Sequence, residues 1–194
     1  SSYRRLLDTL EQTARTVAGG AAPRVVLLTP GLYSETYFEH AYLARYLGLP
    51  LVEGGDLTVR GEHLFLKTVE GLEPVHGVLR RLDDDFCDPL ELRQDSTLGV
   101  PGLLRAVRAG RVLLANALGS GFLESPAING FLPAIARREF GAELHLPSLD
   151  SWWCGEAAAW HDVKGQLHDK VVRSTFPSGG QVSAVRRPDE AQIE

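Results

Sequence analysis

The chain has 194 residues, of which 44% are hydrophobic, and its formal net charge at pH 7 is −5. Its basic residues are scattered, and no apolar run approaches the roughly 20 residues that cross a bilayer, so we expect neither nucleic acid nor a membrane as a partner. Cys87 and Cys154 lie far apart without the spacing of a zinc site, which favours reduced thiols and a cytoplasmic location.

The first quarter of the chain predicts a helix and then a strand–helix–strand unit. Apolar residues recur at a helical period over residues 3–18. A β-branched run over residues 24–29 is typical of a buried strand, and a helix that Ser34 would cap ends at Gly48, before a second strand over 50–53. This order predicts parallel pairing with a right-handed crossover.

A hairpin and further strands follow. Residues 57–69 alternate apolar and polar residues around a tight turn, which predicts a β-hairpin. Continuous apolar runs fit strands buried on both faces, so we expect a parallel core sheet with the hairpin attached at an edge. The expected core strands are 25–29, 51–53, 75–82 and 112–116. Helices are expected over 101–109 and 125–140, and a last strand over 170–174.

The predicted fold class is α/β, a mainly parallel, Rossmann-like sheet flanked by helices with an attached β-hairpin. The chain contains no methionine and turns polar over residues 182–194, which favours a segment of a larger protein. We expect three parts: an N-terminal helix and linker over 1–23, an α/β domain over 24–150, and a further portion over 151–194. In the last part, Trp152 and Trp153 are expected to pack a small core.

The turn after the first strand is the first candidate for a ligand site. Thr29, Gly31 and Tyr33 lie between a strand and a helix, at the edge where open α/β sheets bind ligands and a helix N-terminus offers N–H groups to an anion. A plain strand-to-helix connection is the alternative. The chain has no G-x-G-x-x-G and no Walker A pattern, so a standard dinucleotide or P-loop site is not expected.

The densest charge cluster follows the predicted strand 75–82 and comprises Arg80, Arg81, Asp83, Asp84 and Asp85. Two guanidiniums can hold a carboxylate or a phosphate, and clustered carboxylates can bind Mg²⁺ or orient the arginines. Charges that pair with each other in a solvated loop are the alternative. Alternation along the strand sends Arg80 and Arg81 to opposite faces, so at most one of them faces a given ligand.

A glycine-containing turn follows the strand expected at 112–116. The backbone of Asn116, Gly119, Ser120 and Gly121 can approach a phosphate closely. Because all three candidate segments follow strands of one sheet, we expect them to converge on one cleft at its carboxyl edge. The six histidines show no spacing typical of a metal site.

Five segments, in this order, resemble motifs of the circularly permuted ATP-grasp proteins, which are related to glutathionylspermidine-synthetase-like ligases. They are Val25–His40, Leu51–Leu57, Arg80–Pro89, Asp95–Gly102 and Asn116–Gly121. The resemblance implies that residues 24–150 form a pre-ATP-grasp-like domain and that residues 151–194 begin an ATP-grasp portion.

The resemblance also implies ATP-dependent joining of a carboxylate to an amine through an acyl phosphate. The full-length protein would use ATP and Mg²⁺, with small-molecule or peptide carboxylates and amines as substrates. That chemistry needs cationic side chains on the developing charge and carboxylates on the metal. Arg80 and Arg81 are therefore candidates for catalysis, and Asp83–Asp85 for Mg²⁺.

The chain departs from many relatives of this family at two places. Glu-Ser-Pro-Ala at Glu124–Ala127 replaces Asp-Lys-Ala, a form that resembles a subgroup whose ATP-grasp part adjoins an α-helical domain. Val-Val-Arg-Ser at Val171–Ser174 replaces Val-Ile-Lys-Pro, so Arg173 is the expected nucleotide contact. We expect this chain alone to bind ATP weakly or not at all and to have no ligase activity. The alternative function is a non-catalytic binding or scaffolding domain that retains the fold.

Overall fold

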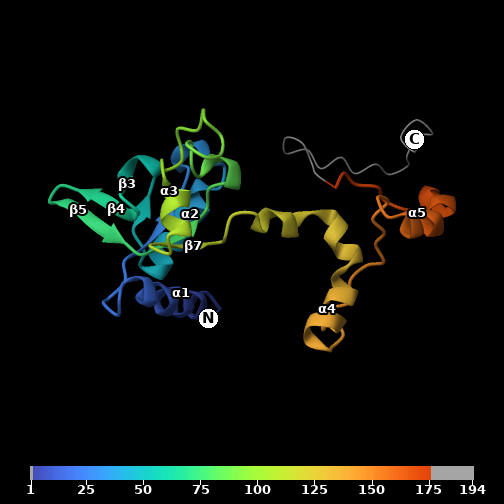
Figure 1. Ribbon diagram of the computed structural model, residues 1–194. Helices are drawn as coiled ribbons and strands as arrows, with labels where there is room; N and C mark the ends of the chain where they lie inside the picture. The colour runs from blue at the N-terminus through green and yellow to red at the C-terminus, as the bar shows by residue number, and fades with distance from the viewer. Residues whose placement is uncertain (1, 176–194) are drawn as a thin grey trace. The chain divides into compact units, whose positions relative to one another are not determined.

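The computed structural model describes residues 2–175, and internal contacts divide the chain after Gly119 into two compact units. The first unit, residues 1–119, holds every strand of the described chain. The second unit begins at Ser120, and its described part is mainly helical. Figure 1 shows the first unit in blue to yellow-green and the second in yellow to red.

A four-stranded parallel sheet forms the centre of the first unit, as predicted. Its strands are β1 (Val25–Leu28), β2 (Leu51–Val52), β6 (Gly77–Arg80) and β7 (Leu113–Ala115), in the order β2-β1-β6-β7. All four residues of β1 are buried, because both faces of this central strand are covered. The prediction that 112–116 lies in the same sheet as 25–29 is confirmed.

Helices cover both faces of this sheet. On one face, Leu27 and Leu79 pack in one apolar cluster with residues of α1 (Ser2–Val17) and α2 (Tyr37–Leu47). On the other face, Val26, Val78 and Leu114 pack with α3 (Leu103–Arg108). Successive strand residues point to opposite faces, so the continuous apolar runs supply both clusters.

A separate antiparallel sheet comprises β3 (Leu57–Arg60), β4 (His63–Thr68) and β5 (Gly71–Val75). The predicted hairpin is therefore part of a three-stranded sheet, and it joins the parallel sheet through core side chains such as Leu64 rather than through strand pairing. The predicted strand 75–82 is wrong in its extent, because the chain leaves one sheet at Val75 and enters the other at Gly77.

Short helices make up the described part of the second unit, and two predictions there need correction. They are η4 (Ser120–Glu124), η5 (Pro126–Gly130), α4 (Leu132–Phe140), α5 (Ala157–Val163) and η6 (Lys164–Asp169). The helix expected over 125–140 is interrupted near Gly130, where an added Cβ would lie 2.9 Å from the carbonyl oxygen of Ser151. The strand expected over 170–174 is reduced to an isolated bridge at Val172, because the described part of this unit contains no strand to pair with it.

Trp152 and Trp153 lie between α4 and α5 and are incompletely buried. The indole nitrogen of Trp152 donates to Asp162 Oδ2 at 2.8 Å, and Lys170 Nζ lies 4.7 Å from the centre of a Trp152 ring. Trp153 packs against Phe131 at a ring separation of 6.1 Å. The three-part division of the chain at residues 23 and 150 stays a prediction. No helix among the described residues is long and apolar enough to cross a membrane.

Candidate functional site

Backbone segments that follow β2 and β6 pack tightly at the carboxyl edge of the parallel sheet. A Cβ atom on Gly54 would lie 2.2 Å from the carbonyl oxygen of Leu98. A Cβ atom on Gly99 would lie 2.1 Å from the carbonyl oxygen of Phe86. These distances leave no room for a side chain, so glycine at both positions lets three backbone segments lock together at this edge.

The buried carboxylate of Asp88 fastens the same region to the start of α3. Asp88 is fully buried, and its Oδ1 accepts hydrogen bonds from the backbone N–H groups of Leu90 and Gly102, both at 3.0 Å. Its Oδ2 accepts from the N–H of Leu104 at 3.0 Å. Asp88 lies 14 residues before Gly102 in the sequence, yet it accepts hydrogen bonds from backbone N–H groups at the start of α3. Local helix-capping patterns do not reveal this contact.

The guanidinium of Arg80 is bound by an aspartate and by backbone carbonyl oxygens of the first unit. Its side chain is 8% exposed and forms an ion pair with Asp84 at 2.5 Å. The guanidinium also donates to the carbonyl oxygens of Asn116 at 3.2 Å, Ala117 at 3.5 Å, and Leu82. These contacts tie the end of β6 to the loop after β7. Few of its donors remain for a ligand, so we assign Arg80 a structural part in this arrangement.

Asp84 pairs with Arg80 through Oδ1, and its Oδ2 accepts a hydrogen bond from the Gly119 N–H at 2.7 Å. Its neighbours Asp83 and Asp85 are exposed. Among the described residues, no group of three or more histidine, cysteine, aspartate or glutamate side chains could hold a metal ion. The arrangement of Asp83–Asp85 therefore does not fit a resident Mg²⁺ site.

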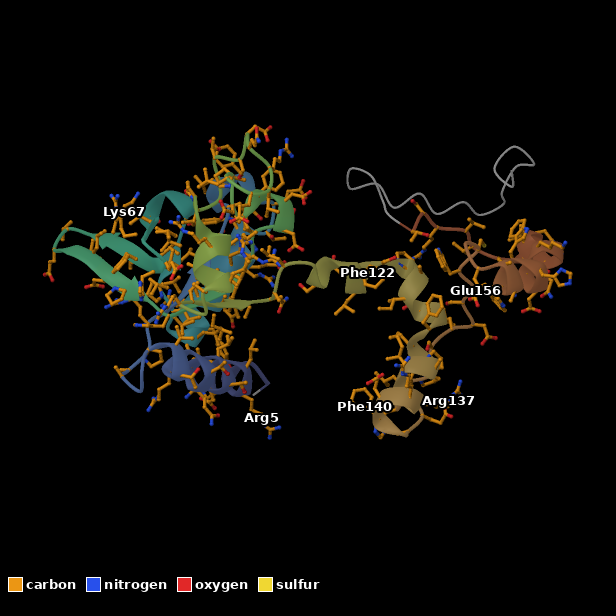
Figure 2. The ribbon with its side chains drawn as sticks, viewed as in Figure 1. Arg5, Lys67, Phe122, Arg137, Phe140 and Glu156 are labelled. Atoms are coloured by element: carbon orange, nitrogen blue, oxygen red, sulfur yellow. The ribbon has the colours of Figure 1, made fainter. Side chains whose placement is uncertain are left out.

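Arg81 directly follows β6 and lines a cleft of about 440 Å³. The side chain forms no ion pair or hydrogen bond with the described residues. The cleft is built from the loop after β1 and the segment after β6. Its lining residues are Pro30, Tyr33, Ser34, Glu35, Thr36, Arg81, Leu82, Asp83, Phe86 and Leu98. Figure 2 shows the side chains of the first unit in the view of Figure 1.

A chain of hydrogen bonds supports the β1–α2 side of this cleft. The Gly31 N–H donates to Thr29 Oγ1 at 3.1 Å, and Thr29 Oγ1 lies 2.9 Å from His40 Nδ1. His40 Nε2 lies 3.1 Å from Thr36 Oγ1. Thr29 is 1% exposed, and His40 Nδ1 is the acceptor that the described structure offers to its hydroxyl hydrogen. We therefore assign the proton of neutral His40 to Nε2, which donates to Thr36.

His40 is 3% exposed, and the spacings typical of metal sites do not single it out in the sequence. Burial lowers its pKa, the positive charge of Arg81 lowers the pKa further, and Glu39 opposes both effects. The neutral ring is thus favoured, which agrees with the hydrogen-bond chain.

The predicted site residues therefore fall into two clusters instead of one cleft. Arg80, Asp84 and the backbone of 116–119 form one cluster on the α3 side. Tyr33, Arg81 and Asp83 line the cleft between the loop after β1 and the segment after β6. The separation follows from the alternation of side chains along β6, which sends successive arginines to opposite faces.

The remaining candidates differ in their settings. Thr29 faces the interior, and Gly31 has a positive φ of 71° at the turn. Ser120 and Gly121 open η4 in the second unit, and the exposed Arg173 follows the bridge at Val172. Ser34 is not the residue that directly precedes α2, because Thr36 holds that position. The ligand-binding roles of these residues stay predictions.

Comparisons with known proteins agree with one another. A model of the family described as circularly permuted ATP-grasp type 2 matches residues 1–194. The uncharacterized protein sll0335 of Synechocystis sp. is 43% identical over 160 residues, which is 82% of this chain and 33% of that protein. The uncharacterized protein Rv2411c of Mycobacterium tuberculosis is 37% identical over 189 residues, 97% of this chain and 34% of that protein.

A further relative in Mycobacterium tuberculosis, the uncharacterized protein Rv2567, is 43% identical over 153 residues, 79% of this chain and 17% of that protein. This chain therefore spans only 17% to 34% of the length of these relatives.

Proposed function

The chain belongs to the circularly permuted ATP-grasp type 2 family, and we propose that it is the substrate-side α/β portion of an ATP-dependent carboxylate–amine ligase. One observation carries the proposal: the cleft at the carboxyl edge of the parallel sheet contains Arg81, whose guanidinium has no ion-pair partner among the described residues. Open α/β sheets bind their ligands at this edge.

The proposed reaction makes an amide. An oxygen of the acid's carboxylate takes the γ-phosphoryl group of ATP, and ADP leaves. The amine nitrogen then bonds to the acyl carbon, the bond from that carbon to the phosphate oxygen breaks, and the nitrogen loses a proton as inorganic phosphate departs. A guanidinium can hold the carboxylate and stabilise charge on its oxygens. Arg81 is the residue of this chain that we assign to that task.

ATP-grasp proteins generally use ATP and Mg²⁺. Since the described residues contain no cluster that fits a metal ion, we do not assign Mg²⁺ to the first-unit cleft. The cleft's part in the proposal is to bind and orient the acid substrate and, through Arg81, to stabilise charge on its carboxylate oxygens. Orientation of bound reactants is a large contribution to ligation, because it removes the entropic cost of bringing them together.

A test of the proposal uses the full-length protein that contains this chain. The protein is incubated with MgATP and the low-mass filtrate of a cell extract, and released ADP is measured together with the masses of new products. We expect ADP release that depends on the filtrate, and a product whose mass is the sum of two consumed compounds less one water. Arg81→Gln should lower the rate at least about 10-fold, whereas Arg111→Gln, an equal charge change at another exposed arginine, should not.

The alternative is a binding or scaffolding domain that keeps the fold without turnover. Filtrate-independent or absent ADP release from folded full-length protein, with no new amide, would contradict the ligase proposal and support that alternative. Equal rates of ADP release in wild-type protein and Arg81→Gln would show that Arg81 and its cleft take no part in the reaction.

A further inference from the structure

The first-unit cleft contains charges of both signs that the described structure leaves without partners. Arg81 supplies a guanidinium, and Glu35 and Asp83 supply carboxylates from the loops after β1 and β6. None of the three side chains forms an ion pair or a side-chain hydrogen bond with the described residues. A ligand with one negative and one positive group could meet both.

The hydrogen-bond chain through His40 gives the cleft a directed donor. With the His40 proton on Nε2, Thr36 Oγ1 accepts from the ring, and its own hydroxyl hydrogen can pass to Ser34 Oγ at 2.9 Å. Ser34 Oγ also accepts from the Thr36 N–H at 3.2 Å. In this arrangement Ser34 Oγ accepts from Thr36 in both contacts, and its own hydrogen is available to a group in the cleft that it lines.

Apolar surface accompanies the charges. Leu82, Phe86 and Leu98 line the cleft, and the ring of Tyr33, 86% exposed, stands at its side. A volume of about 440 Å³ lies within the range of small-molecule sites and exceeds what a single small ion needs. The lining therefore fits an organic molecule with an apolar part between or beside its charged groups.

We propose that this cleft binds a zwitterionic amino acid or short peptide, with its carboxylate on Arg81 and Ser34 and its ammonium group on Glu35 and Asp83. This inference rests on the proposed function, because it names the substrate class of the same cleft. Arginine matches carboxylate geometry through paired N–H donors, and carboxylates are acceptors for all three ammonium hydrogens. Two carboxylates and one guanidinium disfavour a simple anion, since the site would carry a net negative charge.

Calorimetry on the full 194-residue chain tests the inference with matched probes. The probes are L-leucine and L-leucyl-L-leucine, and each has an N-acetyl analogue without the ammonium charge and a C-terminal amide without the carboxylate. We expect at least one zwitterion to bind, and removal of either charge to weaken its binding at least about 10-fold. Arg81→Gln should weaken binding of the zwitterion by a similar factor, and Arg111→Gln should leave the affinity for the zwitterion unchanged.

Glu35→Gln combined with Asp83→Asn sharpens the assignment. In this variant the zwitterion and its N-acetyl analogue should bind with similar affinity, because the cleft no longer offers charge to the ammonium group. Unfolding midpoints of all variants are measured beside the binding data, so that a folding defect is recognised. Failure of both zwitterions to bind the wild-type chain overturns the inference. Equal binding of the N-acetyl or amide analogues does so as well.

The two proposals fail in different ways. If the zwitterion binds as expected but the full-length protein shows no ATP-dependent amide formation, the binding inference stands and the ligase proposal falls. If amide formation occurs, is unaffected by Arg81→Gln, and no zwitterion binds the cleft, the ligase proposal stands and this inference falls.

Discussion

The two units of the chain differ in how they bury apolar side chains. The first unit encloses its parallel sheet between two apolar clusters, with Leu27, Leu28 and Val26 fully buried. In the described part of the second unit, the buried hydrophobic residues are only Ala136, Val163 and Leu167. Segments with few buried contacts open at low free-energy cost, so we expect the second unit to open far more readily than the first.

Both units expose aromatic side chains, and they differ in the core that lies beneath these side chains. Figure 2 labels Phe122 and Phe140 on the second unit, and these residues are 59% and 80% exposed. The first unit also exposes aromatic residues, such as Tyr33, but they lie on a scaffold with its own core. The candidate cleft thus belongs to the unit that can hold its side chains in fixed positions, which a binding site requires.

The largest expected difference between the two units is the rate at which their cysteines react with a thiol reagent. Cys87 of the first unit is fully buried, and burial raises its pKa to about 11 despite the opposing charge of Arg80. Cys154 of the second unit is exposed. At pH 8 only about one Cys87 in a thousand is a thiolate and its sulfur is buried, so we expect a thiol reagent to label the exposed Cys154 at least about 100-fold faster. Single-cysteine variants, followed by absorbance of the released thiol, measure both rates. Similar rates would mean that the first unit is as open as the second.

Asp88→Ala should destabilise the first unit more than the loss of any of its exposed ion pairs. It removes the acceptor of three backbone N–H groups in a fully buried position, and we expect a loss of about 3 kcal/mol in the free energy of unfolding. Chemical denaturation followed by far-ultraviolet circular dichroism measures it. Asp95→Ala, at an exposed aspartate paired with Arg93, is the control and should change little. A small effect at Asp88 would show that the start of α3 does not depend on this carboxylate.

A pair of glycine substitutions compares packing in the two units. Gly99→Ala places a Cβ 2.1 Å from the Phe86 carbonyl oxygen, so we expect about 2 kcal/mol of destabilisation through displaced backbone. Gly165→Ala meets no atom within 4 Å and should be neutral or slightly stabilising. Thermal unfolding of both variants gives the comparison. A Gly99→Ala protein as stable as wild type would contradict the close packing at the carboxyl edge.

The smallest effect concerns pH. Because the pKa of His40 is lowered in the folded state, the unfolded chain binds a proton more readily below the usual histidine pKa of 6.5. The contribution to stability is complete above pH 6.5 and declines as the pH falls below it, by no more than about 1.4 kcal/mol per pH unit. Arg81 and Glu39 are the charges that act on this ring. His40→Gln should flatten that decline, whereas His168→Gln, at an exposed histidine of the second unit, should not. Equal declines in urea-unfolding series from about pH 7 to pH 5 would exclude His40 as a cause.

Much of the first unit could be predicted because its strands are short, continuous apolar runs. Residues 25–28 are buried on both faces, and their sequence shows this directly. The strand β5 was harder to predict, since Gly71 and Pro74 are unusual within strands. Pro74 is tolerated because β5 is an outer strand, where the missing N–H costs no ladder bond.

The candidate site was predictable only in part. Arg81 and Asp83 stand out as charges at a strand end, and both line the cleft. The pairing of Arg80 with the backbone at 116–117 joins residues 36 and 37 positions apart, so spacing cannot reveal that it is already occupied. His40 and Asp88 were missed for the same reason, because their roles depend on folded contacts and burial rather than on a local pattern.

The most direct test of the central claim, that the first-unit cleft at Arg81 is the substrate site, is a chemical-shift map of backbone amides. L-leucyl-L-leucine is titrated into isotope-labelled chain, with wild-type protein and Arg81→Gln compared. We predict saturable shifts centred on residues 33–36 and 81–83, and their loss in Arg81→Gln. Shifts centred on the second unit, or no saturable shifts in the wild-type chain, would contradict the claim.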